Sequence, residues 1–139
     1  MLDRVRSSAV DDVIVVIGAH QVATQARTVK CLEWERGPGA SLRCGLDELS
    51  EKVEAAVVVL ADGPNLHPYA IDRVISLWRE ERSPIVAAAY GGQRLHPVLI
   101  ERSVWDAVPD EGLRDLPAEL VECGDLGAPG DVDTPADLR

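Results

Sequence analysis

One acidic side chain, Asp62, follows the apolar run Ala56–Leu60 and a single alanine. Such a run is typical of a buried parallel strand, and the Gly63-Pro64 pair behind it indicates a turn. In open α/β sheets, ligands bind beyond the carboxyl ends of the strands, so the pattern predicts a position at which Asp62 can meet a ligand. An isolated carboxylate there needs a cation, a basic partner or water. The alternative is that Asp62 only caps the turn.

The elements that must position Asp62 alternate between strand patterns and helix patterns. Apolar runs predict strands at 11–18, 29–34, 56–61, 84–90, 96–100 and 120–123. Helical spacing predicts helices over 41–52, with Ser41 as the N-cap, and from Pro68 onward, with shorter helical pieces at 19–28, 104–108 and 112–116. The glycines and proline of 35–40 indicate a loop, and Pro97 suggests an edge strand for 96–100. The pattern favours a single α/β domain over residues 1–139.

Charge excludes some classes of partner. The net charge is −10 and the pI is about 4.6, which argues against sequence-independent binding to nucleic acid or to an anionic membrane. A polyanionic small ligand stays possible, because a metal ion can bridge acidic side chains to phosphate. No run of spanning length and no signal peptide is recognised, so we expect no membrane association.

The cysteines indicate a compartment. Cys31, Cys44 and Cys123 are odd in number and have neither metal-ligand spacing nor the pattern of a disulfide framework. We therefore expect free thiols and a cytoplasmic protein.

Five short motifs follow one another in an order that one family shares. They are Trp34, Gly37, Ser41, Leu42 and Gly45; then Leu60-Ala61-Asp62-Gly63-Pro64; then His96-Pro97-Val98; then Asp110, Gly112 and Arg114; and finally Asp131-Val132-Asp133-Thr134-Pro135 with Asp137-Leu138. On these motifs the sequence resembles the MobA-like nucleotidyltransferases, in particular the molybdenum-cofactor cytidylyltransferase branch. The resemblance implies a three-layer, Rossmann-like α/β fold of the nucleotide-diphospho-sugar transferase type, with a mostly parallel sheet.

The resemblance also implies an activity. Members of the family transfer a nucleoside monophosphate from a nucleoside triphosphate, here CTP or GTP, to a phosphorylated acceptor such as molybdopterin, with Mg²⁺ as cofactor. Asp62 is then the catalytic metal ligand. Asp131 and Asp133 are two residues apart, so in an extended segment they face the same side and either could join Asp62 on one ion. The alternative for Asp133 is capping beside Thr134.

The acceptor pocket implied by the resemblance involves Gly37, Ser41 and His96. A structural histidine beside a proline turn is the alternative for His96. Arg114 could meet a phosphate or pair with Asp110. The tryptophans are most simply packing residues.

One part of the family pattern is not found. The glycine-rich N-terminal signature, with its lysine, is not among these residues, and neither Lys30 nor Lys52 follows a glycine-rich loop. We therefore expect a fold truncated at its N-terminus, without the triphosphate loop and its strand. The alternative function is a non-catalytic nucleotide-binding or assembly domain.

The absent strand would lie between the strands at 11–18 and 56–61. We expect that the gap closes or that a second copy covers it, which favours a homo-oligomer. A receiver-type phosphoacceptor domain fits less well, because Asp11 and Asp12 precede their strand and no lysine follows Lys52.

Overall fold

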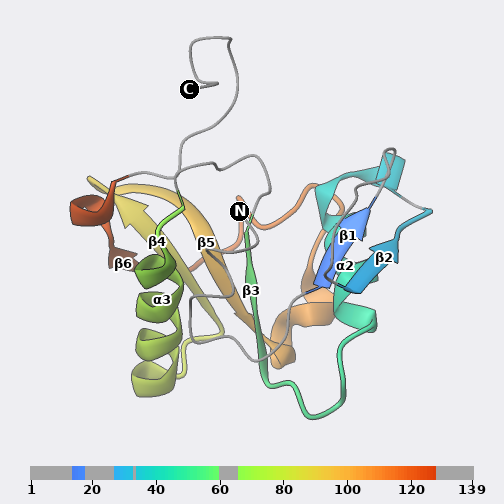
Figure 1. Cartoon of the computed structure of the whole chain (residues 1–139), viewed down its shortest axis with the longest axis horizontal. Helices are drawn as coiled ribbons and strands as arrows, with labels where there is room; N and C mark the ends of the chain where they lie inside the picture. The colour runs from blue at the N-terminus through green and yellow to red at the C-terminus, as the bar shows by residue number, and fades with distance from the viewer. Residues whose placement is uncertain (1–13, 18–26, 33, 60–65, 128–139) are drawn as a thin grey trace, which may run out of the picture. The chain divides into compact units, whose positions relative to one another are not determined.

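The structure, a computed structural model, describes residues 14–17, 27–32, 34–59 and 66–127, and this part of the chain contains both helices and strands (Figure 1). These residues form two compact units, which we name after their α-helices. The α3 unit holds the described residues of 57–100 and 118–127, and the α2 unit holds those of 14–56 and 101–117. The fold is of the α/β class, as predicted.

The α3 unit is built on a four-stranded sheet. Its strands lie in the order β3 (Ala55–Val58), β5 (Gln93–Glu101), β4 (Ile85–Tyr90) and β6 (Glu119–Glu122). β4 pairs with β5 in the antiparallel sense and with β6 in the parallel sense. The sheet is therefore mixed, and the expectation of a mostly parallel sheet holds for only part of it.

Helix α3 (Pro68–Glu81) packs on this sheet and supplies much of the core. It starts where the sequence predicts, because Pro68 suits the first helical position and the Nδ1 of His67 accepts a hydrogen bond from the Tyr69 N–H at 3.2 Å. It ends at Arg82, which adopts a left-handed conformation with φ 54°. The helix packs on β4, all six residues of which are buried. Its own buried face consists of Ala70, Ile71, Val74, Ile75 and Trp78.

Strand β5 corrects one prediction. Pro97 suggested an edge strand, but β5 has nine residues and lies between β3 and β4. The register shifts between Ala87, which faces Val98, and Ala89, which faces Arg94. This irregularity places Pro97 within the shifted stretch, so the missing N–H of the proline interrupts no regular ladder bond with β4.

The α2 unit contains the parallel pair β1 (Ile14–Ile17) and β2 (Arg27–Lys30), helix α2 (Pro38–Asp47) and two short 3₁₀ helices, η1 (Trp34–Arg36) and η2 (Arg102–Ala107). The predicted strand at 29–34 is displaced towards the N-terminus, and Arg27 and Thr28 belong to a strand instead of the predicted helix. The predicted loop 35–40 is largely helical, and the helix predicted over 41–52 starts and ends earlier. Gly37, not Ser41, is its N-cap.

The cysteine prediction is wrong for one pair. Cys31 and Cys44 form a disulfide with 5.8 Å between their Cα atoms, and Cys123 is the free, buried cysteine. The pair is 13 residues apart in sequence and meets only because α2 folds back towards the end of β2. Local spacing carries no sign of such a contact.

Other predictions have mixed outcomes. The 3₁₀ helix η2 and strand β6 lie close to their predicted places. Residues 112–116, predicted as a helix, form turns. A third 3₁₀ helix, η3 (Gly124–Leu126), follows β6. The residues of β3 are half-buried, not fully covered. Among the described strands, β1 and β3 belong to different sheets, so they do not close the predicted gap by pairing with each other. No helix in the described ranges has the length and apolar character of a membrane span.

Candidate functional site

The predicted site residues fall into three groups. Asp62, Asp131 and Asp133, the predicted metal ligands, lie outside the described residues. The predicted acceptor residues Gly37 and Ser41 lie at the start of α2, and Arg114 lies in the same unit. His96 lies on β5 in the α3 unit.

The start of α2 packs directly on the turn 109–112. The N–H of Gly39 donates to the carbonyl oxygen of Asp110 at 2.8 Å, and the N–H of Gly112 closes the turn by donating to the Pro109 carbonyl at 3.0 Å. A Cβ atom on Gly37 would lie 2.3 Å from the Asp110 oxygen, and Gly37 has φ 133°, a value that favours glycine. The structure therefore gives Gly37 a packing reason to lack a side chain, and its role towards substrate stays a prediction.

Asp110 holds the centre of this contact through its side chain. Its Oδ1 accepts from Nη2 of Arg43, and its Oδ2 accepts from Nη2 of Arg36 at 3.3 Å. Arg43 also donates through Nη1 to the carbonyl oxygen of Val108. The hydrogen bond from Arg43, with the charges of both arginines, holds the pKa of Asp110 below its usual range. The carboxylate is therefore ionised at neutral pH and engaged on both oxygens.

Arg114 is not the partner of Asp110. It lies exposed two residues after Gly112, whose φ is 102°, while the Asp110 carboxylate pairs with Arg36 and Arg43. Of the two readings of Arg114, pairing with Asp110 is therefore not found, and contact with a phosphate stays a prediction.

Ser41 lies in the second turn of α2 and is half-buried. It is neither the N-cap nor part of the contact with the turn 109–112. Its proposed role towards substrate is not changed by this placement.

His96 precedes Pro97 through a cis peptide bond. Its carbonyl oxygen accepts a hydrogen bond from the Tyr90 hydroxyl at 3.0 Å, and burial raises the pKa of Tyr90 to about 12. The main chain at His96 is thus tied to the end of β4. Contact of its side chain with substrate stays a prediction.

A second polar cluster lies where β4 and β6 end, and it involves none of the predicted site residues. Arg73 of α3 binds both carboxylate oxygens of Asp125 at 2.7 and 2.8 Å and also donates to the Glu122 carbonyl at 3.2 Å. The bidentate bond lowers the pKa of Asp125 and raises that of Arg73. Both charges are therefore satisfied within the protein.

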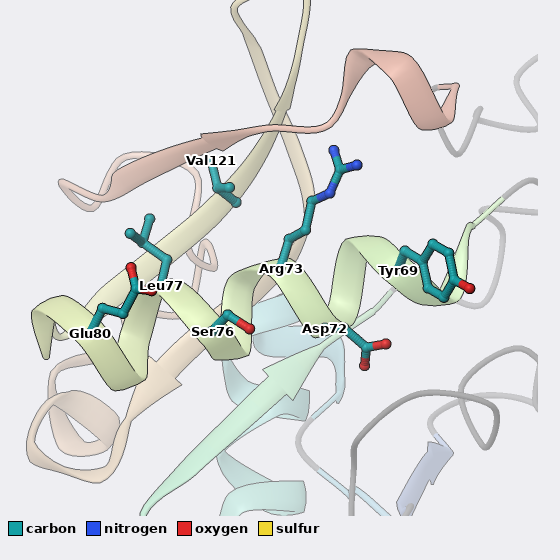
Figure 2. A pocket seen from close by; sticks show the side chains of 7 residues that line it. All are labelled: Tyr69, Asp72, Arg73, Ser76, Leu77, Glu80 and Val121. Atoms are coloured by element: carbon teal, nitrogen blue, oxygen red, sulfur yellow. The ribbon is translucent and has the colours of Figure 1, made fainter.

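An open hollow of about 390 Å³ lies along α3 beside β6. Figure 2 shows Val121 of β6 pointing towards α3, and the hollow is lined by Tyr69, Asp72, Arg73, Ser76, Leu77, Glu80 and Val121. None of the predicted site residues lines it, so we assign it no part in the predicted chemistry.

The described residues contain no group of three His, Cys, Asp or Glu side chains that could hold a metal ion. The chemistry of the predicted donors nevertheless suits a hard divalent cation, because carboxylate oxygens are the ligands that Mg²⁺ and Mn²⁺ prefer. The assignment of a metal to Asp62, Asp131 and Asp133 therefore stays a prediction.

Sequence reasoning missed two residues of this contact, Arg36 of η1 and Arg43 of α2. A local signal does exist for Arg43, because it lies four residues after Gly39 and so on the same helical face. Its partner, however, is 67 residues away in sequence. Only the fold shows that the first and fourth motifs are in contact.

Comparison with known proteins gives a family and a fold. The model of the MobA-like NTP transferase domain family matches residues 1–122. No curated protein matches the chain. Among solved structures, Rv0371c of Mycobacterium tuberculosis H37Rv is similar with TM-score 0.72 and 23% identity over 98% of this chain and 78% of that one.

Two further structures are similar. The complex of Rv0371c with manganese has TM-score 0.74 and 23% identity, covering 98% of this chain and 80% of that one. A homologue of Rv0371c from Mycobacterium sp. strain JC1 has TM-score 0.77 and 21% identity, covering 98% and 76%. At these identities the likeness shows a shared fold.

Proposed function

The chain belongs to the MobA-like NTP transferase domain family, and from this premise we propose that it transfers a nucleoside monophosphate from CTP or GTP to a small phosphorylated acceptor such as molybdopterin. The observation that carries the proposal is the family match over residues 1–122. A phosphate oxygen of the acceptor attacks the α-phosphorus, a new phosphorus–oxygen bond forms, and pyrophosphate leaves with the electrons of the bond that breaks. Such a reaction asks the protein mainly for positioning and for neutralisation of charge.

A divalent cation, Mg²⁺ or Mn²⁺, is the proposed cofactor. Asp62, Asp131 and Asp133 are the residues proposed to hold it, and their oxygen donors suit such an ion. A manganese complex exists for one structural neighbour, which supports a divalent metal in this fold. When bound, the ion would neutralise charge on the phosphates.

The acceptor is proposed to bind where α2 begins. Gly37 is the N-cap residue of α2, Ser41 carries a hydroxyl one turn later, and Arg114 is exposed in the same unit. A guanidinium and a hydroxyl both recognise phosphate oxygens. His96 is proposed as a further acceptor contact.

Metal-dependent binding of nucleotide tests this function. The melting temperature is measured with CTP, GTP, ATP and UTP, each with Mg²⁺ or Mn²⁺ and each with chelator. We expect CTP or GTP with metal to raise the melting temperature, and Asp62→Asn to abolish the rise. Asp106→Asn, which changes an exposed aspartate of η2 in the same way, serves as the matched control and should respond like the wild type.

Pyrophosphate release then separates transfer from binding. With nucleotide, metal and molybdopterin, the wild type should release pyrophosphate and Asp62→Asn should not. Binding without release in the wild type would favour the non-catalytic nucleotide-binding domain. No metal-dependent shift with any nucleotide would contradict both functions.

A further inference from the structure

The contact between α2 and the turn 109–112 leaves no room for a side chain on Gly37 or Gly39. A Cβ atom on Gly39 would lie 1.6 Å from the Pro109 carbonyl oxygen, and one on Gly112 would lie 3.4 Å from Cγ of Pro38. Side chains at positions 37 and 39 would push the turn away. The first and fourth motifs, at the start of α2 and in the turn 109–112, therefore pack directly against each other.

Asp110 joins the two halves through both its main chain and its side chain. Its carbonyl oxygen satisfies the Gly39 N–H, one of the amides at a helix start that have no partner inside the helix. Its carboxylate binds Arg43, which lies on the next turn of α2, and Arg36, which precedes Gly37. Asp110 is thus bonded to residues on both sides of the turn that starts α2.

The Asp110 carboxylate is poorly suited to touch the proposed acceptor. A phosphorylated acceptor is an anion, and a carboxylate repels it unless a cation intervenes. Both oxygens are already engaged by guanidinium groups, and the bond to Arg43 is charge-assisted. The geometry assigns this side chain to holding the protein rather than binding the substrate.

Resting on the proposed function, we propose that Asp110, held by Arg43, is a positioning residue that fixes the turn Gly37–Ser41 for the acceptor. Arg43 does this better than a lysine could, because its planar fork reaches the Val108 carbonyl and the Asp110 carboxylate at once. Small displacements of a positioning group cost on the order of 100-fold in rate. We call the bonds from Arg36 and Arg43 to Asp110 the clamp. Because the clamp fixes the proposed acceptor site, losing it should weaken binding of the acceptor and leave binding of the nucleotide unchanged.

Asp110→Asn tests the clamp itself, because it removes the charge and keeps the size. The readout is amide hydrogen exchange over residues 36–42, which a loosened turn accelerates. Arg43→Lys is the second variant, in case the first does not fold, and Asp106→Asn is the matched control. We expect exchange to rise about tenfold in both clamp variants and to stay at the wild-type rate in the control. Unchanged exchange in both clamp variants would overturn the proposal.

Steady-state kinetics with molybdopterin and CTP or GTP test the acceptor role. We expect the KM for molybdopterin to rise about tenfold or more, with the KM for nucleotide within about twofold of wild type. Equal changes in both KM values, or no change in either, would overturn the positioning role. A wild-type chain that binds no nucleotide would instead overturn the proposed function and the acceptor role with it, while the exchange data would still show whether Asp110 fixes the turn.

Discussion

The carboxylate of Glu122, the last residue of β6, accepts a hydrogen bond from the backbone N–H of Gly91 at 2.9 Å. It also accepts from Gly92 at 3.1 Å and from Gly124 at 2.7 Å. One side chain therefore ties the end of β6 to the turn between β4 and β5. These three backbone donors favour the charged form and lower the pKa of Glu122 below its ordinary value.

The stability of the α3 unit should therefore fall in acid in a way that depends on Glu122. A carboxyl whose pKa is lower in the folded state stabilises the fold above its unfolded pKa, near 4.5, and this stabilisation is lost as the pH falls through the folded pKa. Glu122→Gln should unfold at lower urea concentration at about pH 7 and should lose less stability than wild type on going to about pH 3. Glu81→Gln, at the exposed end of α3, is the control, and the same acid response in Glu122→Gln and wild type would contradict the prediction.

The buried face of α3 should dominate the stability of its unit. Ile71 is fully buried, so Ile71→Ala leaves a cavity and should lower the free energy of unfolding by about 2–5 kcal/mol. Urea unfolding followed by tryptophan fluorescence, to which Trp78 at 6% exposure contributes, measures this loss. Glu81→Ala on the exposed end of the same helix should change stability by less than about 0.5 kcal/mol. A loss of that small size in Ile71→Ala would show that α3 does not pack as described.

Alkylation should distinguish the free thiol of Cys123 from the two cysteines of the disulfide. Cys123 is fully buried, and burial raises the pKa of its thiol, so the native protein should take up no label. After unfolding, only Cys123 should react without reductant, and all three cysteines should react after reduction. Reduction should also lower the free energy of unfolding by about 2–4 kcal/mol, the usual effect of a disulfide that closes a loop of this length. Three labels on the unfolded, unreduced protein would contradict the disulfide.

Local patterns were enough to predict α3 and β4. Pro68 marks the start of the helix, its apolar spacing gives the buried face, and the run from Ile85 to Tyr90 is buried at every position. These signals are read from neighbours in sequence, and no distant contact overrides them. The family motifs likewise predicted the family correctly from residues alone.

Distant contacts explain what the sequence did not predict. Gly37, Pro38 and Gly39 indicated a loop, but Pro38 occupies the first turn of a helix and the glycines are required by the turn 109–112. Pro97 indicated an edge strand, but a register shift accommodates it inside the sheet. The contact of α2 with the turn 109–112 and the pairing of β5 with β3 both join residues that are well separated along the chain.

Gly39→Ala tests whether the turn 109–112 determines the residue at this position. In an ordinary helix, the change from glycine to alanine stabilises by roughly 1 kcal/mol. Here the new methyl group would lie 1.6 Å from the Pro109 carbonyl oxygen, so the backbone must move and the bond from Gly39 to Asp110 weakens. We expect a net loss of about 1–3 kcal/mol in urea unfolding, as is usual for overpacked sites. Asp47→Ala, at the exposed end of α2, should be neutral or slightly stabilising. If Gly39→Ala is as stable as the wild type, α2 does not pack on this turn, and the clamp through Asp110 loses its structural basis.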